Sequence, residues 1–124
     1  MNSKKIIQRK LLKHHSNSLK TPGYYSDLAG ADLRFMDLRR LNLKNINLSG
    51  SDLSFSDLRE ADFSFARLKG ANISHCKTDG AIFNHAVCTG VDFSGSNIKA
   101  AIFTGALMDD NNLPESKLTT THLI

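Results

Sequence analysis

The chain has 124 residues, enough for one folded domain, and its hydrophobic fraction of 40% suits a folded, soluble chain. No stretch approaches the roughly 18 consecutive apolar residues of a membrane span. The net charge of +4 divides unevenly, because residues 1–20 hold six Lys or Arg and no acid. Residues 21–124 hold ten Lys or Arg against twelve Asp or Glu, a net of −2, so a basic segment precedes a mildly acidic body.

The first predicted unit, residues 1–23, is a short capping helix or a basic tail. If residues 3–14 are helical, four side chains make a broad apolar face: Ile6, Ile7, Leu11 and Leu12. Asn2 or Ser3 would cap that helix, and Thr21-Pro22-Gly23 would break the chain after it. The alternative is a disordered tail. The segment has no apolar core of signal-peptide length, so we expect no secretory signal.

The basic residues of this segment suggest a contact with an anionic partner. A cluster of cations beside apolar residues is attracted to anionic surfaces, so a peripheral membrane contact is one expectation, whereas direct nucleic-acid binding is not expected. The residues that would carry the contact are Lys4, Lys5, Arg9, Lys10 and Lys13. A solvated tail with no partner is the alternative, and it is slightly favoured.

The second unit, residues 24–124, is a five-residue repeat. Its large central residues run from Leu28 to Leu123 in twenty units without an insertion, and nineteen of the twenty are apolar. Two residues earlier, sixteen of twenty are small, and the residue between is Asp or Asn in twelve. Small, polar and large residues thus alternate in, out and in, which predicts a three-residue strand followed by a turn.

A second spacing predicts how many units make one coil. Glycine recurs every twenty residues at Gly30, Gly50, Gly70 and Gly90, and a corner with positive φ favours glycine. The large residues Phe63, Phe83 and Phe103 are also twenty apart. Twenty residues are four units, so we predict a four-walled coil. The five coils span residues 26–45, 46–65, 66–85, 86–105 and 106–124.

These units resemble those of the pentapeptide repeat proteins, as "ADLRF", "SDLSF", "SDLRE", "ADFSF" and "ANISH" illustrate. The resemblance implies an all-β fold, a right-handed quadrilateral β-helix, in which five four-sided coils stack. Large residues near the first coil, Met36, Leu41 and Ile46, suggest a wide mouth on which the N-terminal helix would sit.

No catalytic, cofactor or metal site is expected. A lumen filled by Leu, Phe and Ala leaves no cleft for convergent groups. The aspartates recur because the wall recurs, and we interpret them as a solvated wall with local backbone hydrogen bonds. Cys76 and Cys88 should point inward as free thiols, while His75 and His85 fall on opposite corners. Thr78, the one polar centre, should bond to nearby backbone through its hydroxyl.

One departure from the pattern predicts an interface. Four outward residues are apolar, and we call them the apolar corner: Ile82, Val87, Ile102 and Leu107. Each pair twenty apart stacks on one wall, and the two walls are adjacent. Exposed apolar patches mark interfaces, so we expect a homodimer contact. The alternatives are cover by the N-terminal helix and an exposed wall without a role.

We therefore expect a non-catalytic, bacterial, cytoplasmic interaction scaffold that binds another protein, with no cofactor. Export as a secreted effector stays open. The resemblance also raises a second function, since members of the family mimic DNA, bind a type II topoisomerase (gyrase) and protect it from quinolones. A DNA-sized negative field disagrees with the net of −2 over residues 21–124, so direct mimicry is the weaker alternative.

Overall fold

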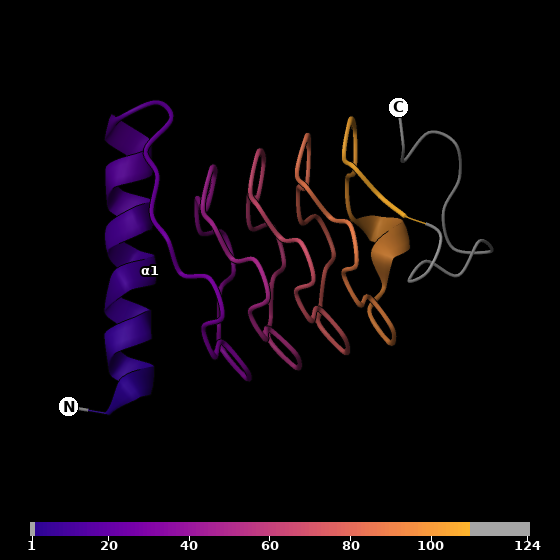
Figure 1. The fold of residues 1–124 in the computed structure, drawn as a ribbon, viewed down its shortest axis with the longest axis horizontal. Helices are drawn as coiled ribbons and strands as arrows, with labels where there is room; N and C mark the ends of the chain where they lie inside the picture. Colours follow the sequence, from indigo (N-terminus) through magenta and orange to yellow (C-terminus); the bar gives the residue numbers. More distant parts are fainter. Residues whose placement is uncertain (1, 110–124) are drawn as a thin grey trace.

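The computed structural model describes residues 2–109, in which one helix is followed by a stack of coils (Figure 1). Helix α1 spans Ser3–Lys20, and a 3-10 turn, η1, spans Ile98–Ala100. Within the described residues the remaining regular structure consists of isolated parallel β-bridges, because each three-residue strand is too short for a longer ladder. The residues predicted to complete the fifth coil, 110–124, lie outside the described part.

The bridges join residues that are twenty apart. Asp32 pairs with Asp52, Asp52 with Asn72, and Asn72 with Asp92, and the other walls repeat this shift. Backbone hydrogen bonds follow the same shift: Leu53 N donates to Asn72 O at 2.8 Å, and Asn72 N donates to Ser51 O at 2.9 Å. The prediction of four units per coil is confirmed.

The core is a column of side chains along the axis of the coils. The large central residues are buried from Leu28 to Phe103. Phe63, Phe83 and Phe103 stack with ring centroids 5.2 and 5.0 Å apart, and Phe93 meets the last two edge-on. The predicted phenylalanine ladder therefore exists, and it fills the C-terminal part of the lumen.

The corners differ from the prediction. We expected one glycine corner per coil, but the residue two after each centre has a positive φ at other corners too. Phe35, Arg40 and Asn45 have φ of 59, 62 and 64°, close to the angles of the corner glycines. Every unit from the one centred on Leu28 to the one centred on Phe93 turns through this conformation, and the unit centred on Ile98 turns through η1 instead. Glycine at one column was a correct marker of the period, but that column is not unique in its geometry.

One wall is interrupted in the fourth coil. The bridge Asp57↔Lys77 has no successor at Asn97, and η1 follows instead. Thr78 lies under this turn, and its Oγ1 donates to Asn97 O at 2.9 Å. The hydroxyl of Thr78 therefore bonds to backbone, as predicted, and the carbonyl that accepts from it lies in the next coil.

Helix α1 is longer than the predicted 3–14, and Asn2 is its cap, since Lys5 N donates to Asn2 Oδ1 at 2.8 Å. Its apolar face is narrower than expected. Leu11 is buried and Ile7 packs on the core, whereas Ile6 and Leu12 are 42% and 57% exposed. The reason is that α1 meets the flat end of the first coil along one narrow stripe, with histidines completing the contact.

Candidate interaction surfaces

The contact between α1 and the first coil is built by two histidines. His14 is 1% exposed, and its Nε2 lies 2.8 Å from Lys44 O while its Nδ1 contacts Ser26 Oγ. A carbonyl oxygen only accepts, so Nε2 carries the proton and the Ser26 hydroxyl donates to Nδ1 in the neutral ring. Burial lowers the pKa of His14 more than the Lys44 carbonyl raises it. Tyr24 packs edge-on against the ring.

His15 satisfies the exposed edge of the same wall. Asn42 N donates to its Nδ1 at 2.7 Å. One coil later the equivalent group, Asp62 N, donates to Leu41 O of the first coil. The first coil has no coil stacked before it, so His15 supplies the acceptor that such a coil would supply. Open solenoid ends need such caps. Sequence reasoning missed both histidines, although a His-His pair in the C-terminal half of a basic helix that precedes unpaired strand edges was a usable signal.

The wall aspartates and asparagines have a structural role. In ten units the side-chain Oδ1 accepts the backbone N–H two residues later, as Asp52 does from Ser54 N at 2.9 Å. This local bond helps the chain enter the left-handed corner that follows. The recurring acids therefore act on the fold, as predicted.

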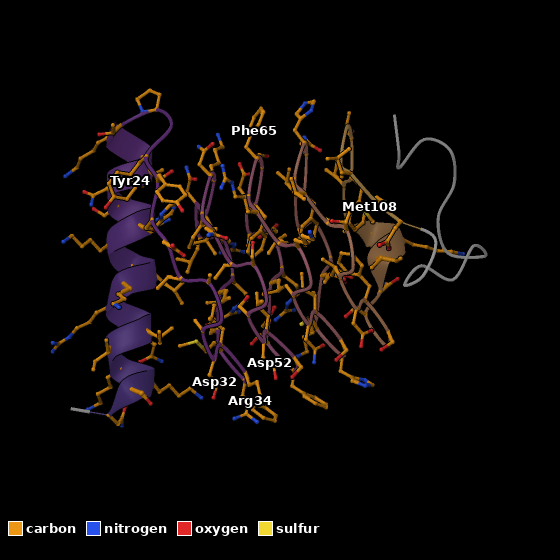
Figure 2. The ribbon with its side chains drawn as sticks, in the orientation of Figure 1. Tyr24, Asp32, Arg34, Asp52, Phe65 and Met108 are labelled. Atoms are coloured by element: carbon orange, nitrogen blue, oxygen red, sulfur yellow. The ribbon has the colours of Figure 1, made fainter. Side chains whose placement is uncertain are left out.

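Arginines neutralise several of these acids. In the units that read Asp-Leu-Arg, Arg34, Arg39 and Arg59 each pair with the aspartate two residues before, with N–O distances of 2.9, 2.9 and 2.6 Å. These hydrogen bonds lower the pKa of Asp32 and Asp37 to about 2. The column that carries Asp32 and Asp52 on one side of the rod (Figure 2) is therefore not a uniform negative stripe.

The thiols and imidazoles of the described residues do not converge on a site. Burial raises the pKa of Cys76 to about 11 and that of Cys88 to about 12, which favours the protonated thiols at neutral pH. Among residues 2–109, no three His, Cys, Asp or Glu side chains come together as metal ligands.

The apolar corner is assembled as the spacing predicts. Ile82 bridges Ile102 on one wall, and Val87 bridges Leu107 on the next. Ile102 is 44% and Leu107 59% exposed, while Ile82 and Val87 are half-buried. The corner between the walls carries His85, whose ring stacks on Phe65 at 5.0 Å. Phe65, 58% exposed at the edge of the rod (Figure 2), extends the apolar surface toward the second coil.

The diagonally opposite corner holds a comparable aromatic column that the sequence analysis did not single out. Phe35, Phe55 and His75 stack at 5.2 and 4.9 Å, and both phenylalanines are more than half exposed. No apolar wall residues flank this column; Arg39, Asp57 and Lys77 lie beside it instead. Both corners carry exposed aromatic rings, but the residues beside this column are charged, whereas the four residues of the apolar corner are not.

The predicted anion-binding residues all lie on α1. Lys4, Lys5, Arg9, Lys10 and Lys13 are exposed, and Lys20 is exposed at the helix end. The ion pairs of the described residues involve only cations of the coils, so none joins α1 to a carboxylate. Within residues 2–109, α1 is the one α-helix, and it is too polar to cross a bilayer.

Comparison with known proteins agrees with this geometry. A family model described as pentapeptide repeats matches residues 26–64, 66–105 and 86–123. A thylakoid-lumen pentapeptide repeat protein of Arabidopsis thaliana is 31% identical over 77% of this chain, with a TM-score of 0.56. The match covers 61% of that protein, less than two thirds of its length.

Two other solved structures share the fold. One is a pentapeptide repeat protein of the cyanobacterium Cyanothece, 21% identical over 82% of this chain and 98% of that one, with a TM-score of 0.51. The other is QnrB1, a plasmid-mediated fluoroquinolone resistance protein, 19% identical over 69% of this chain and 41% of that one, with a TM-score of 0.62. The search of curated proteins finds no match.

Proposed function

Because the chain belongs to the pentapeptide repeat family, we propose that it is a non-catalytic interaction scaffold whose right-handed quadrilateral β-helix dimerises through the apolar corner. The single observation behind the proposal is the stacking of exposed Ile102 and Leu107 on the half-buried Ile82 and Val87. Elsewhere in the described coils the bridged wall positions are polar or charged. Burying a large aliphatic side chain contributes about 1.5–3 kcal/mol, so covering this corner is favourable.

A second copy fits this surface on electrostatic grounds. The four residues carry no charge, and Asn84, Thr89 and Thr104 beside them are uncharged. On the N-terminal side, Ile82 bridges Asp62 and Val87 bridges Arg67, so one acid and one base border the corner. Two identical apolar strips can meet about a two-fold axis with these opposite charges at the margin. A polar rim around an apolar centre is the usual arrangement at interfaces.

The position of α1 bears on whether this helix, rather than a second copy, could cover the apolar corner. The helix lies across the N-terminal end of the stack (Figure 1) and is held to Lys44 and Asn42 of the first coil. The apolar corner belongs to the third, fourth and fifth coils. This placement of α1 argues against the alternative that the N-terminal helix folds back over the corner.

The size of the corner suggests a reversible dimer. Stable interfaces bury about 800 Å² on each partner, contributed by about 20–30 residues. Four wall residues with Phe65 supply only the centre of such an interface. We expect a monomer–dimer equilibrium that shifts with protein concentration.

Sedimentation velocity over a range of concentrations tests the proposal. We expect the parent chain to approach twice its monomer mass as concentration rises, and Ile102→Asp/Leu107→Asp to stay monomeric. Phe35→Asp/Phe55→Asp is the matched control, because it places two carboxylates on equally exposed apolar residues of the opposite corner.

A parent chain that is monomeric at every concentration would exclude the dimer. So would a dimer that withstands both carboxylates at the apolar corner, or one lost equally in the control. Circular dichroism of each variant separates loss of the dimer from loss of the fold.

The topoisomerase alternative has weaker support. The similarity to QnrB1, at 19% identity, shows a shared fold alone. A duplex presents one charge per about 1.7 Å, whereas here Arg34, Arg39 and Arg59 neutralise aspartates on the walls. We expect no inhibition of gyrase supercoiling and no protection from quinolones at micromolar protein. Either effect would reverse the order of the two proposals.

A further inference from the structure

Helix α1 carries six cations and no acid, and none of the six forms an ion pair with a carboxylate of the described residues. The cations are Lys4, Lys5, Arg9, Lys10, Lys13 and Lys20. Each is exposed. Several acids of the coils pair with arginines of the coils or with Lys44. Lys4 lies beside Asp32 of the first coil, so the other five cations set the outward-facing charge of α1.

The outward face of α1 also exposes two leucines. The residues Lys5, Arg9, Leu12, Ser16 and Leu19 follow one another at steps of four and three, so they lie along one face of the helix. Leu12 is 57% and Leu19 64% exposed, and Ile6 on the flank is 42% exposed. Leu11 and His14 are the residues buried against the first coil, and Leu12 and Leu19 lie about 80–100° around the helix from Leu11, at the border of the outward face. The helix is thus anchored by one face and presents a basic face with apolar side chains on the other.

The arrangement of α1 and the coils gives this face an unobstructed approach. Figure 1 shows α1 lying across the end of the stack, with all the coils on one side of it. A flat surface can therefore meet the whole length of the helix without touching a wall. We propose that the outward face of α1 binds the surface of an anionic lipid bilayer, so that the rod stands upright on the membrane and its walls remain free.

The leucines favour a bilayer over a nucleic acid. Phosphate backbones are bound by cations and polar groups, and leucine contributes nothing to that contact. At a membrane, by contrast, leucines enter the boundary between headgroups and acyl chains while the surrounding cations contact anionic headgroups. Lys5, Arg9, Leu12 and Leu19 together match the second situation. This surface lies at the far end of the rod from the apolar corner, so the two proposals stand independently.

Vesicle co-sedimentation of the full chain is the test. We expect binding to vesicles of phosphatidylcholine with about 30% phosphatidylserine, and none to phosphatidylcholine alone. Lys5→Glu/Arg9→Glu should bind at least about tenfold more weakly, since each cation near an anionic surface strengthens binding severalfold. Leu12→Ser/Leu19→Ser should also weaken binding while keeping the charge. The matched control is Lys69→Glu/Lys77→Glu, an equal charge change on exposed wall residues.

The orientation is tested by fluorescence. The chain contains no tryptophan, so a single introduced tryptophan is an unambiguous reporter. The emission of Leu12→Trp should shift to shorter wavelength on anionic vesicles, and that of Phe65→Trp, on a side corner, should not.

Four results would overturn the proposal: no binding to anionic vesicles at low salt, equal loss in the Lys69/Lys77 control, full binding by the leucine variant, or a shift at position 65 equal to that at position 12. Binding of a DNA duplex that competes with the vesicles and survives Leu12→Ser/Leu19→Ser would also contradict a lipid partner. Circular dichroism of every variant shows whether the fold is intact.

Discussion

At the scale of single residues, the corners show how the repeat tolerates an unfavourable conformation. Phe35, Phe55 and Phe65 adopt left-handed φ angles near 60°, which cost a residue with a Cβ about 1–2 kcal/mol. Stacking between successive corner rings offsets part of this conformational cost, since an aromatic pair contributes about 0.5–1.5 kcal/mol. The last ring of each column is a histidine, and it packs over the glycine at the same corner of the next coil: His75 over Gly95 and His85 over Gly105.

This packing predicts different costs for two glycine substitutions. A Cβ on Gly50 meets no atom within 4 Å, whereas a Cβ on Gly95 would lie 2.4 Å from Nδ1 of His75. Gly50→Ala should lower the free energy of unfolding by about 1–2 kcal/mol, the cost of the left-handed angle. Gly95→Ala should cost more, because the His75 ring must also leave its stack.

Urea denaturation of the two variants measures the difference. Adding His75→Ala should remove most of the extra cost in Gly95→Ala and none of the cost in Gly50→Ala. Equal losses in the two glycine variants would show that the ring does not constrain the corner.

At the scale of elements, α1 is a cap whose contact with the first coil is made by two histidines. His15 accepts the Asn42 N–H, and His14 is buried between Ser26 and Lys44. The folded-state pKa of His14 lies below its ordinary 6.5, so the fold favours the neutral ring. Its contribution is complete above pH 6.5 and is lost as pH falls through the lower folded pKa.

We therefore expect the free energy of unfolding to decrease as the pH is lowered from about 7 toward 5, with α1 detaching first. His14→Gln should be less stable at pH 7, but its stability should change less over this range. The carboxyl groups of Asp32 and Asp37 have a pKa of about 2, so they titrate below the pH range of this measurement. Denaturation followed at several pH values decides; parallel curves for parent and variant would contradict this role.

The polar centre Thr78 gives a second prediction for an element, the turn η1. Thr78→Val preserves volume but leaves the Asn97 carbonyl without its donor. Asn97 is exposed and water can reach its carbonyl, so we expect the loss of an ordinary hydrogen bond, about 0.5–1.5 kcal/mol, in urea denaturation together with local loosening of η1.

The control for this prediction is the preceding centre. Ile73 is fully buried in the same column of large residues and makes no side-chain hydrogen bond. Ile73→Val should therefore cost about 0.5–1.5 kcal/mol without any effect on the turn. Unchanged amide exchange around Ile98–Ala100 in Thr78→Val would contradict the link between the hydroxyl and η1.

At the scale of the whole molecule, the period of the sequence predicts most of the rod. Large residues at every fifth position and phenylalanines twenty apart were sufficient to predict the coil, its four walls and the apolar corner. They did not predict the contacts at the end of the rod, because His14 and His15 bind unpaired backbone groups and do not belong to the repeat. The width of the apolar face of α1 was overestimated for a related reason: helical periodicity identifies possible faces, and the flat end of the first coil selects one.

The twenty-residue shift between layers is the central claim, because the walls, the apolar corner and the filled lumen all follow from it. Paired cysteines test it most directly. Outward residues of bridged pairs lie about 4.8 Å apart, within the span of a disulfide, and the two native thiols are buried. Asn72→Cys/Asp92→Cys should form an intramolecular disulfide under mild oxidation, whereas Asn72→Cys/Val87→Cys, fifteen residues apart, should not. Efficient bonding of the second pair without the first would contradict the four-walled coil.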